Sequence, residues 1–278
     1  MHNTIRILDC AAMAPHFPRW RVGAPCLLVE TDHGPVLVDT GMGLHDYASP
    51  GPMVRAFSAA LNVVRDPEQT AVRQLARLGY LPEDVRHIVL THLHFDHAGG
   101  LPDFPHAQVH GHRREYTALQ RPRWWMAWAY DPRDFAHSPR WVLYEQPNAT
   151  WFGFDAIRLP FAPEMYLIPL LGHTRGHCGV AIREGDEWLF QCGDALPTNA
   201  QFDLTPQWLN RLAIGPHVPR LRAFAAAHPE VRVLAGHMWQ SFFEESPKSK
   251  VESPKSLCAS HPMRLGRLLI SVTLCHWR

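Results

Sequence analysis

The segment Thr91–Gly100 constrains the fold most, because it concentrates metal-ligand side chains directly after an apolar run. Four potential ligands lie within six residues: His92, His94, Asp96 and His97. Imidazole nitrogens suit zinc and iron, and a carboxylate can coordinate a metal or orient a water molecule. The preceding residues 85–90 predict a buried strand, so the ligands would lie where a strand opens into a loop. The competing interpretation is a histidine-rich surface loop, since the chain holds 19 histidines.

Three further candidate ligands lie far along the chain, each directly after a glycine. The apolar segments 166–171, 188–192 and 231–235 predict strands that end just before these glycines. The residues that follow the glycines are His173, Asp194 and His237. This shared context, together with the freedom of glycine to allow close backbone approach, favours one common metal site.

The order of these residues, H-x-H-x-D-H followed by H, D and H, resembles the metallo-β-lactamase superfamily of metal-dependent hydrolases. The resemblance runs from about Ile5 to His237. It implies an α/β (α+β) fold, the four-layer αβ/βα sandwich, with two packed sheets and helices outside them. It also implies two Zn²⁺ ions, or iron or manganese in their place. One metal is expected on His92, His94 and His173, the second on Asp96, His97 and His237, and Asp194 is expected to bridge them.

Three residues are expected to support the ligands without binding metal. Asp39 ends an early strand as Asp-Thr-Gly, where the family's aspartate would hydrogen-bond a ligand histidine and fix its ring; a turn aspartate before Gly41 is the alternative. Thr91 directly precedes the first ligand. His177 is expected to be a hydrogen-bonded structural or supporting residue, because the family's ligand in Gly172–His177 is the first histidine.

The chemistry implied by this resemblance is hydrolysis without a serine or cysteine nucleophile. Two metals roughly 3.5–4 Å apart share a water or hydroxide, whose pKa falls to about 7. One metal polarises the substrate oxygen and the second stabilises the leaving atom. Asp96 is expected to act as general base and acid as well as ligand.

The substrate is less closely specified than the reaction. Residues 98–101 and 104–109 look like the lactonase branch of the family, which favours a lactone or related ester. Some of these lactonases carry a tyrosine three residues after the bridging aspartate, where this chain has Pro197. Thioester, β-lactam and phosphotriester hydrolysis stay open. A different class also stays open: a persulfide-dioxygenase-like oxidoreductase with one iron on His92, His173 and Asp194, against which the second ligand group argues.

Composition narrows the class of protein further. With 278 residues and 46% hydrophobic content, the chain can bury a substantial core. A formal net charge of +1 gives no footprint for nucleic acid, so we expect a small-molecule substrate. No apolar run approaches the roughly 20 residues of a membrane span. The first residues lack the features of a signal peptide, and the six scattered cysteines form no CxxC pair, so a cytoplasmic protein with free thiols is expected.

The carboxyl end differs in composition from the rest. All lysines of the chain lie in a short window: Lys248, Lys250 and Lys255. The same window repeats Glu-Ser-Pro-Lys-Ser, which predicts an extended, flexible segment. We therefore expect a metallo-β-lactamase-like domain over residues 1–243 and an atypical tail over 244–278. A frameshifted or recombined end and a genuine regulatory tail are the two interpretations.

Two other segments are candidates for substrate selection. Residues 47–66 are expected to form an excursion, or lid, near the site. Residues 121–144 are rich in tryptophan and tyrosine, which is typical of an apolar pocket, of ordinary packing, or of a homodimer contact. A second histidine cluster, made of His106, His110 and His112, has no carboxylate and no distant partners, so we interpret its members as strand and loop residues.

Overall fold

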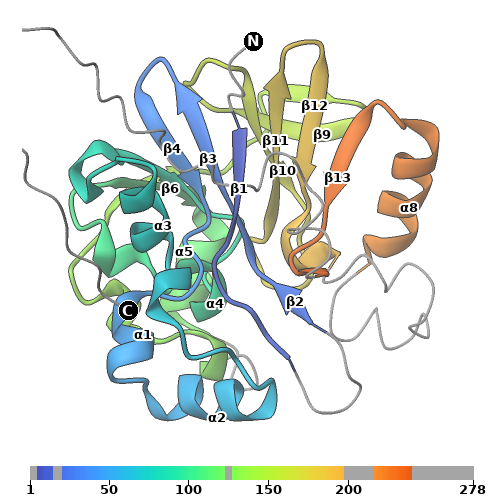
Figure 1. Ribbon diagram of the computed structural model, residues 1–278. Helices are drawn as coiled ribbons and strands as arrows, with labels where there is room; N and C mark the ends of the chain where they lie inside the picture. Colours follow the sequence, from blue (N-terminus) through green and yellow to red (C-terminus); the bar gives the residue numbers. More distant parts are fainter. Residues whose placement is uncertain (1–4, 15–20, 123–126, 197–215, 240–278) are drawn as a thin grey trace, which may run out of the picture.

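Two six-stranded sheets form the centre of the computed structural model, which describes residues 5–14, 21–122, 127–196 and 216–239 (Figure 1). The first sheet has the order β1-β3-β4-β5-β6-β7. Its strands are β1 (Ile5–Asp9), β3 (Pro25–Thr31), β4 (Gly34–Val38), β5 (His87–Val89), β6 (Gln108–His112) and β7 (Arg140–Tyr144). The strands β1, β3 and β4 pair antiparallel, whereas β4 to β7 run parallel.

The second sheet has the order β13-β12-β11-β10-β9-β8. Its strands are β8 (Ala149–Trp151), β9 (Phe154–Arg158), β10 (Met165–Pro169), β11 (Cys178–Glu184), β12 (Glu187–Gln191) and β13 (Val231–Leu234). Only β12 and β13 pair parallel among these neighbours. A short separate ribbon joins β2 (Val22–Gly23) to β14 (Met238–Trp239).

Helices lie on the outer faces of the sheets, with α3 and α5 beside the first sheet and α8 outside the second (Figure 1). The α-helices are α1 (Leu44–Ala48), α2 (Pro52–Ala60), α3 (Ala71–Arg77), α4 (Phe95–Ala98), α5 (Arg113–Gln120) and α8 (Val218–Ala227). The 3₁₀ turns are η1 (Pro67–Gln69), η2 (Pro82–Asp84), η3 (Leu101–Asp103), η4 (Ala127–Ala129), η5 (Pro132–Phe135) and η6 (Gly193–Ala195). None of the helices in these described ranges is long and apolar enough to cross a bilayer.

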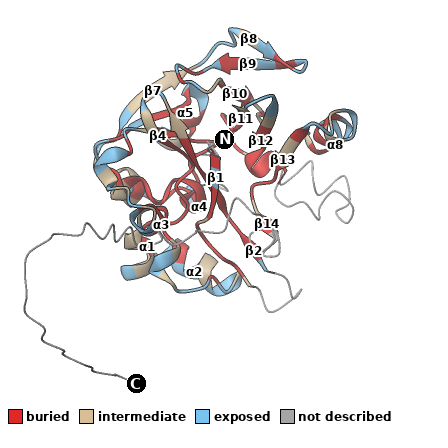
Figure 2. Cartoon of the chain, turned by 45° about the horizontal axis from the view of Figure 1, so that its top comes forward, coloured by how far each residue is buried: buried red, intermediate tan, exposed pale blue. Residues whose placement is uncertain are grey.

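Strand β3 shows why the layers form. Successive side chains of a strand point to opposite faces, and β3 is buried on both faces from Pro25 to Val29. Buried residues gather in the strands at the centre of the molecule, whereas the outer helices α2 and α8 carry many exposed residues (Figure 2). Leu27 and Val29 belong to the core between the two sheets, with Phe190 of β12. Leu28 belongs instead to the core beneath the helices, with Leu75 of α3. The predicted four-layer αβ/βα sandwich is therefore confirmed.

The local predictions are confirmed with one adjustment. The apolar runs 26–30 and 36–39 on either side of residues 32–35 predict a hairpin, and it is present, with β3 ending at Thr31, β4 beginning at Gly34 and Leu27 paired with Val38. The apolar period over residues 68–78 predicts a helix, but the helix is shorter in the structure, because residues 67–69 form the 3₁₀ turn η1 and α3 begins only at Ala71. Asp66 accepts a hydrogen bond from the Glu68 N–H and so caps that separate turn. The predicted tail 244–278, its boundary at 243, and Pro197 lie outside the described residues.

Candidate metal centre

The predicted ligands lie at one edge of the sandwich, because they follow strands that end there. The segment from Thr91, which carries four ligands, begins shortly after β5, and the supporting residue Asp39 comes directly after β4. Asp194 follows β12 in η6, and His237 follows β13. His173 lies in the connection between β10 and β11. The first sheet thus supplies one set of ligands and the second sheet supplies the other.

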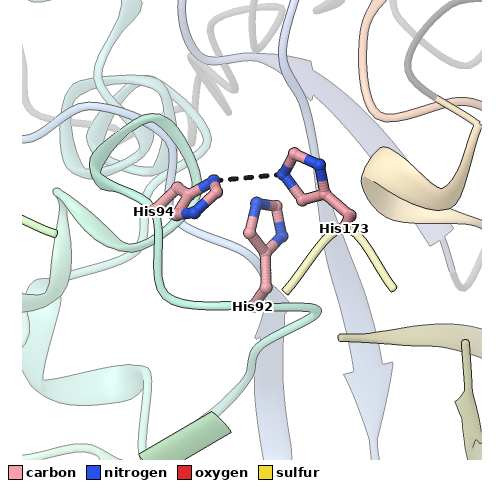
Figure 3. Close-up of side chains that lie close together, drawn as sticks. All are labelled: His92, His94 and His173. Carbon is pink, nitrogen blue, oxygen red and sulfur yellow. Dashed lines mark hydrogen bonds between the residues drawn. The ribbon is translucent and has the colours of Figure 1, made fainter. Parts of the chain in front are cut away.

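His92, His94 and His173 form the first group (Figure 3). Nδ1 of His94 lies 3.1 Å from Nε2 of His173. The His92 ring completes a triangle with them, with its centroid 4.6 Å from that of His94 and 5.0 Å from that of His173. The three rings therefore converge, as the sequence predicted for ligands of one metal.

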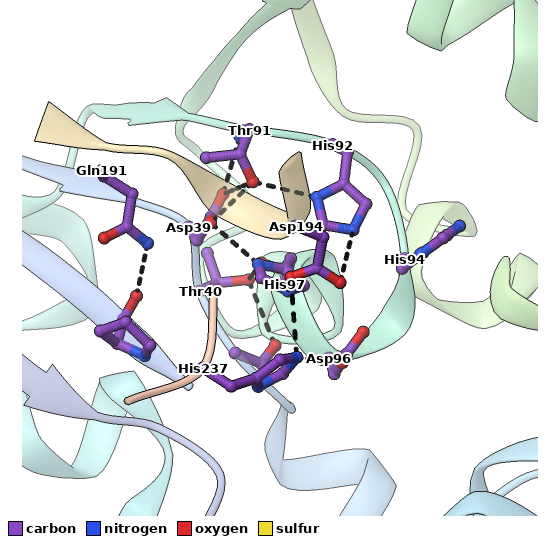
Figure 4. Close-up of polar contacts among 12 residues, drawn as sticks. Asp39, Thr40, Thr91, His92, His94, Asp96, His97, Gln191, Asp194 and His237 are labelled. Atoms are coloured by element: carbon purple, nitrogen blue, oxygen red, sulfur yellow. Dashed lines mark hydrogen bonds and ion pairs between the residues drawn. The ribbon is translucent and has the colours of Figure 1, made fainter. Parts of the chain in front are cut away.

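Asp96, His97 and His237 form the second group, and Asp194 lies between the two groups (Figure 4). Oδ2 of Asp194 lies 3.3 Å from Nε2 of His173 and 4.0 Å from Nε2 of His92. Its Oδ1 lies 3.4 Å from Nε2 of His97 and 3.7 Å from Nε2 of His237. The structure brings together all seven residues predicted as ligands, and each oxygen of Asp194 faces a different group.

Asp39 and Thr91 fix the orientation of two ligand histidines (Figure 4). Nδ1 of His97 donates to Oδ2 of Asp39 at 3.0 Å, because a carboxylate can only accept. The Thr91 hydroxyl donates to the same Oδ2 at 2.9 Å, and Nδ1 of His92 donates to that hydroxyl oxygen at 3.0 Å. When neutral, both rings therefore carry their proton on Nδ1 and leave Nε2 free of a proton. The predicted supporting positions of Asp39 and Thr91 therefore correspond to direct contacts with His97 and His92.

Asp39 is held in a backbone conformation that few residues adopt. Its φ angle is 56°, in the left-handed region, which aspartate and asparagine tolerate better than other side chains. The side chain is also tied down by the backbone N–H of Thr91, which donates to Oδ1 at 2.8 Å. The turn after β4 and the segment after β5 are thus joined by one buried carboxylate. Asp39 therefore both stands in a turn and orients a ligand histidine, as the two interpretations of this residue expected.

The electrostatics of the centre favour neutral imidazoles in the first group. Burial, together with the neighbouring histidines, lowers the pKa of His92 and of His94 well below the usual value. Burial also lowers the pKa of His97, but the carboxylates of Asp194 and Asp96 raise it well above normal. For Asp194, burial raises the pKa while His97, His237 and His173 lower it, so the carboxylate stays ionised.

The buried polar atoms of the donor set show whether these residues fit a metal. Nε2 of His92, His94 and His97 and Oδ1 of Asp194 are buried with no hydrogen-bond partner among the described residues. Buried polar atoms are almost always paired, and each unpaired atom costs roughly 1–3 kcal/mol. Four such atoms gathered at one point fit divalent cations, which replace the missing partners. The residues therefore fit the pair of metals that the sequence predicted.

His177 supports the centre differently from the expectation. Its side chain is fully buried, and its ring centroid lies 5.0 Å from that of His92. Neither of its ring nitrogens has a hydrogen-bond partner among the described residues. The expected hydrogen bond is therefore not found there, and His177 contacts the ligands by ring packing. It is not part of the ligand groups described above.

Two residues that contact the ligand segments were not predicted. The Thr40 hydroxyl donates to the backbone carbonyl of His97 at 3.1 Å and accepts from the Gly100 N–H at 3.1 Å. Glu115, on α5, accepts hydrogen bonds from the segments that carry His92, His94 and His173. Thr40 could have been noticed within Asp-Thr-Gly, whereas Glu115 follows two arginines in a segment that reads as a solvated helix.

The second histidine cluster, the aromatic segment and the expected lid make mainly packing and capping contacts in the part of the chain that the structure describes. His110 and His112 belong to β6, as predicted, and His112 caps α5 by accepting from the Arg114 N–H. Trp141 packs against Tyr116 and Phe135, which supports ordinary packing for that part of the aromatic segment. Trp124, Trp125 and the side chain of Trp128 lie outside the described residues. In the expected lid, the ring of Phe57 on α2 meets that of Phe95 within the ligand motif, with 4.8 Å between centroids.

A separate polar group joins α1 to η5. Nε2 of His45 lies 3.0 Å from Oδ1 of Asp134 and 3.3 Å from Oδ1 of Asp46, and the guanidinium of Arg133 lies 3.7 Å from Asp46. Burial and the nearby Asp134 raise the pKa of Asp46 to about 7. Because His45 and Arg133 compensate the carboxylates, we assign no metal to this group.

Comparison with known proteins decides the family. The family model of the metallo-beta-lactamase superfamily matches residues 19–237, which include every predicted ligand. The chain belongs to the metallo-β-lactamase superfamily. The family and fold class predicted from the sequence are thereby confirmed.

Similar members of the superfamily include hydrolases of known and unknown substrate. A probable metallo-hydrolase of Mycobacterium tuberculosis is 42% identical over 172 residues, which is 61% of this chain and 55% of that protein. The chain thus matches about half the length of that relative. An N-acyl homoserine lactonase of Bacillus thuringiensis is 39% identical over 118 residues, 42% of this chain and 45% of the lactonase.

A solved structure extends the comparison of the fold. An N-acyl homoserine lactone hydrolase, with the product N-hexanoyl-L-homoserine at its catalytic metal centre, superposes with a TM-score of 0.63. The sequence identity is 23%, and the match covers 86% of this chain and 94% of the hydrolase. This likeness extends the shared metallo-β-lactamase fold over most of both chains.

Proposed function

We propose that this protein is a dinuclear metal-dependent hydrolase that opens a lactone or cleaves a related ester. The observation that carries the proposal is the placement of Asp194. One of its oxygens faces His92 and His173, and the other faces His97 and His237. A carboxylate so placed is suited to join two metals. Zinc is the metal we propose, because the site offers imidazole nitrogen and carboxylate oxygen; iron and manganese are the alternatives.

The chemistry needs little from the protein beyond positioning and proton transfer. When bound, two divalent ions supply a hydroxide nucleophile at neutral pH, since they lower the pKa of water to about 7, and they polarise the substrate carbonyl. We assign the proton transfer to Asp96, whose Oδ2 lies 3.6 Å from Nε2 of His237. In ester hydrolysis the water oxygen bonds to the carbonyl carbon, the ester C–O bond breaks and the alkoxide takes a proton. The Asp96 carboxylate can hold that proton between the two steps.

A thiol nucleophile is not favoured at this centre. Cys178 and Cys192 lie close to the site in sequence, but both are fully buried. Burial raises the pKa of each thiol well above its usual value, so neither supplies a thiolate at neutral pH. Attack by water therefore fits this chain better than covalent catalysis by cysteine.

The lactone class is supported by the similarity to N-acyl homoserine lactonases and by the segments that follow the ligand motif. Pro197, where some lactonases carry a tyrosine, weakens the assignment to acyl-homoserine lactones in particular. The substrate panel should therefore contain lactones of several ring sizes and acyl chains, aryl esters, thioesters, β-lactams and phosphotriesters. A lactone or ester hydrolysed well above the others would support the proposal.

Metal content tests the proposal before any substrate is known. Elemental analysis of protein purified without added metal should give close to two zinc ions per chain. A value close to one iron would instead favour a persulfide dioxygenase, with iron on His92, His173 and Asp194. Asp194→Ala should lower metal content and activity together. The control is His106→Ala, since His106 is an exposed histidine near the motif. Full metal content and activity in the Asp194 variant would contradict the bridging role.

A further inference from the structure

Glu115 is a buried carboxylate that the proposed reaction does not use. It is the third residue of α5, and only 3% of its surface is exposed. Its oxygens accept four hydrogen bonds from residues that the structure describes. Oε1 accepts from the Leu93 N–H at 3.2 Å and from the Tyr130 hydroxyl at 3.3 Å. Oε2 accepts from the Thr174 hydroxyl at 2.6 Å and from the Gly176 N–H at 2.9 Å.

Three of these four donors, Leu93, Thr174 and Gly176, belong to the two segments that carry the first group of histidines. Leu93 lies between His92 and His94 in the sequence, and Thr174 directly follows His173. Tyr130, which shares the carboxylate, places the edge of its ring against His94, with 5.2 Å between centroids. One side chain on α5 therefore connects a segment that leaves the first sheet with a segment that leads into the second.

The backbone of α5 also contacts the His173 segment directly. A Cβ atom added to Gly176 would lie 2.1 Å from the backbone nitrogen of Glu115, which no side chain tolerates. Gly176 thus allows its own N–H to reach Oε2. The hydrogen bonds and the close packing are independent observations, and both place this segment against the start of α5.

A carboxylate is required at this position by the kind of donors it meets. The N–H groups of Leu93 and Gly176 can only donate, and they reach different oxygens of Glu115. A glutamine side chain would turn its NH₂ group toward one of them whichever way the amide lies. That backbone N–H would then be buried without an acceptor, so the nearly isosteric substitution breaks one of the two connections.

We propose that Glu115 is a positioning residue that sets the distance between the His92–His94 segment and His173, and so determines affinity at the first metal. None of its four hydrogen bonds involves the second group, Asp96, His97 and His237. The inference rests on the proposed two-metal centre. It predicts that loss of Glu115 weakens the first metal selectively, although both metals share Asp194.

Zinc competition against a chromophoric chelator tests this selectivity. Glu115→Gln should be measured in two backgrounds: His237→Ala, which keeps the first group complete, and His173→Ala, which keeps the second. We expect zinc affinity to fall by roughly 10–100-fold in the first background, the range for lost support of a ligand, and to stay unchanged in the second. An equal loss in both backgrounds, or no loss in either, would overturn the proposal.

A milder variant guards against a general loss of folding. Thr174→Val removes only the hydroxyl that donates to Oε2, and it should lower zinc affinity in the same background and in the same direction. The matched control is Thr117→Val. Thr117 is an exposed threonine on α5, the helix of Glu115, and its hydroxyl donates to the Arg113 carbonyl. If Thr174→Val behaves like Thr117→Val, the connection through Oε2 does not position the site.

A readout without metal or activity completes the test. In chelator-treated protein, amide hydrogen exchange should show that Glu115→Gln loses protection at Leu93 or at Gly176, while the strands β5 and β11 keep theirs. Unchanged protection at both amides would contradict the role. Selective zinc loss without lactone or ester hydrolysis would overturn only the proposed function. Hydrolysis without selective loss would overturn only the role of Glu115.

Discussion

The substitution Asp39→Asn gives the sharpest prediction about the centre, because it should separate metal affinity from stability. The Thr91 N–H donates to Oδ1 of Asp39, and a backbone N–H can only donate. The amide oxygen of an asparagine must therefore take the place of Oδ1. The new NH₂ group then replaces Oδ2 and donates to Nδ1 of His97 and to the Thr91 hydroxyl oxygen. The hydrogen bonds survive with reversed direction, and asparagine tolerates the φ angle of 56°.

The reversal moves a proton into the metal site. With Nδ1 of His97 accepting, the proton of the neutral ring sits on Nε2, the atom that faces Asp194 at 3.4 Å. A protonated nitrogen cannot bind metal, so zinc affinity should fall by about 10–100-fold, or roughly 1.4–2.7 kcal/mol. The free energy of unfolding of metal-free protein should change by less than this. Asp39→Ala, by contrast, leaves up to three buried donors unpaired, at roughly 1–3 kcal/mol each, and should lower that stability strongly.

Two measurements check this reasoning. Zinc affinity is obtained by competition with a chromophoric chelator, and the stability of metal-free protein by urea unfolding in excess chelator. Asp155→Asn, an exposed aspartate on β9, is the control for loss of a charge. If Asp39→Asn binds zinc as tightly as the parent protein, the tautomer of His97 is not set by Asp39 and the argument fails.

Three further results are expected. Gly236→Ala should lower metal content without changing the fold measured by circular dichroism, because the added Cβ would lie 2.0 Å from Oδ1 of Asp194; unchanged metal content would contradict the packing. Asp46→Asn should flatten the dependence of stability on pH. Burial and Asp134 raise the pKa of Asp46 to about 7, so its contribution is complete below the unfolded pKa of about 3.9 and is lost as pH rises through about 7. Urea unfolding of the parent should therefore give a lower free energy at pH 8 than at pH 5, by up to about 1.4 kcal/mol per pH unit for this group, and an equal slope in the variant would refute the assignment. Chelation of metal should lower the melting temperature, since metal binds only the folded centre, and a melting temperature independent of added zinc would argue against that linkage.

The ligand set could be predicted from the sequence because its information is local. Four of the ligands lie within six residues: His92, His94, Asp96 and His97. Each of the distant ligands follows a glycine at the end of an apolar strand. The apolar runs of β3 and β4, with turn residues between them, predicted the hairpin for the same reason, because these signals act over a few positions.

Asp39 was predicted from its place in Asp-Thr-Gly, but the buried carboxylates of Glu115 and Asp46 could not be found in this way. Arg113, Arg114 and Glu115 look like the exposed face of a helix, and Glu115 is buried only because Leu93, Thr174 and Gly176 meet it from other parts of the chain. Asp46 is similar, since its neighbour Asp134 comes from η5. Burial of a charged residue depends on tertiary contacts that no local pattern encodes, whereas the chemistry of a ligand is visible in its residue type.

The division of the ligands between the two sheets has a consequence for how the protein matures. The segment after β5 is synthesised first, but His173, Asp194 and His237 follow much later in the chain, and their sheet closes only when β13 pairs with β12. Contacts so distant in sequence form late and slowly. A growing chain on the ribosome therefore exposes part of the donor set before it can enclose an ion. Metal loading should mark the last stage of folding, and metal supply would then limit the yield of complete centres without affecting the assembly of the first sheet.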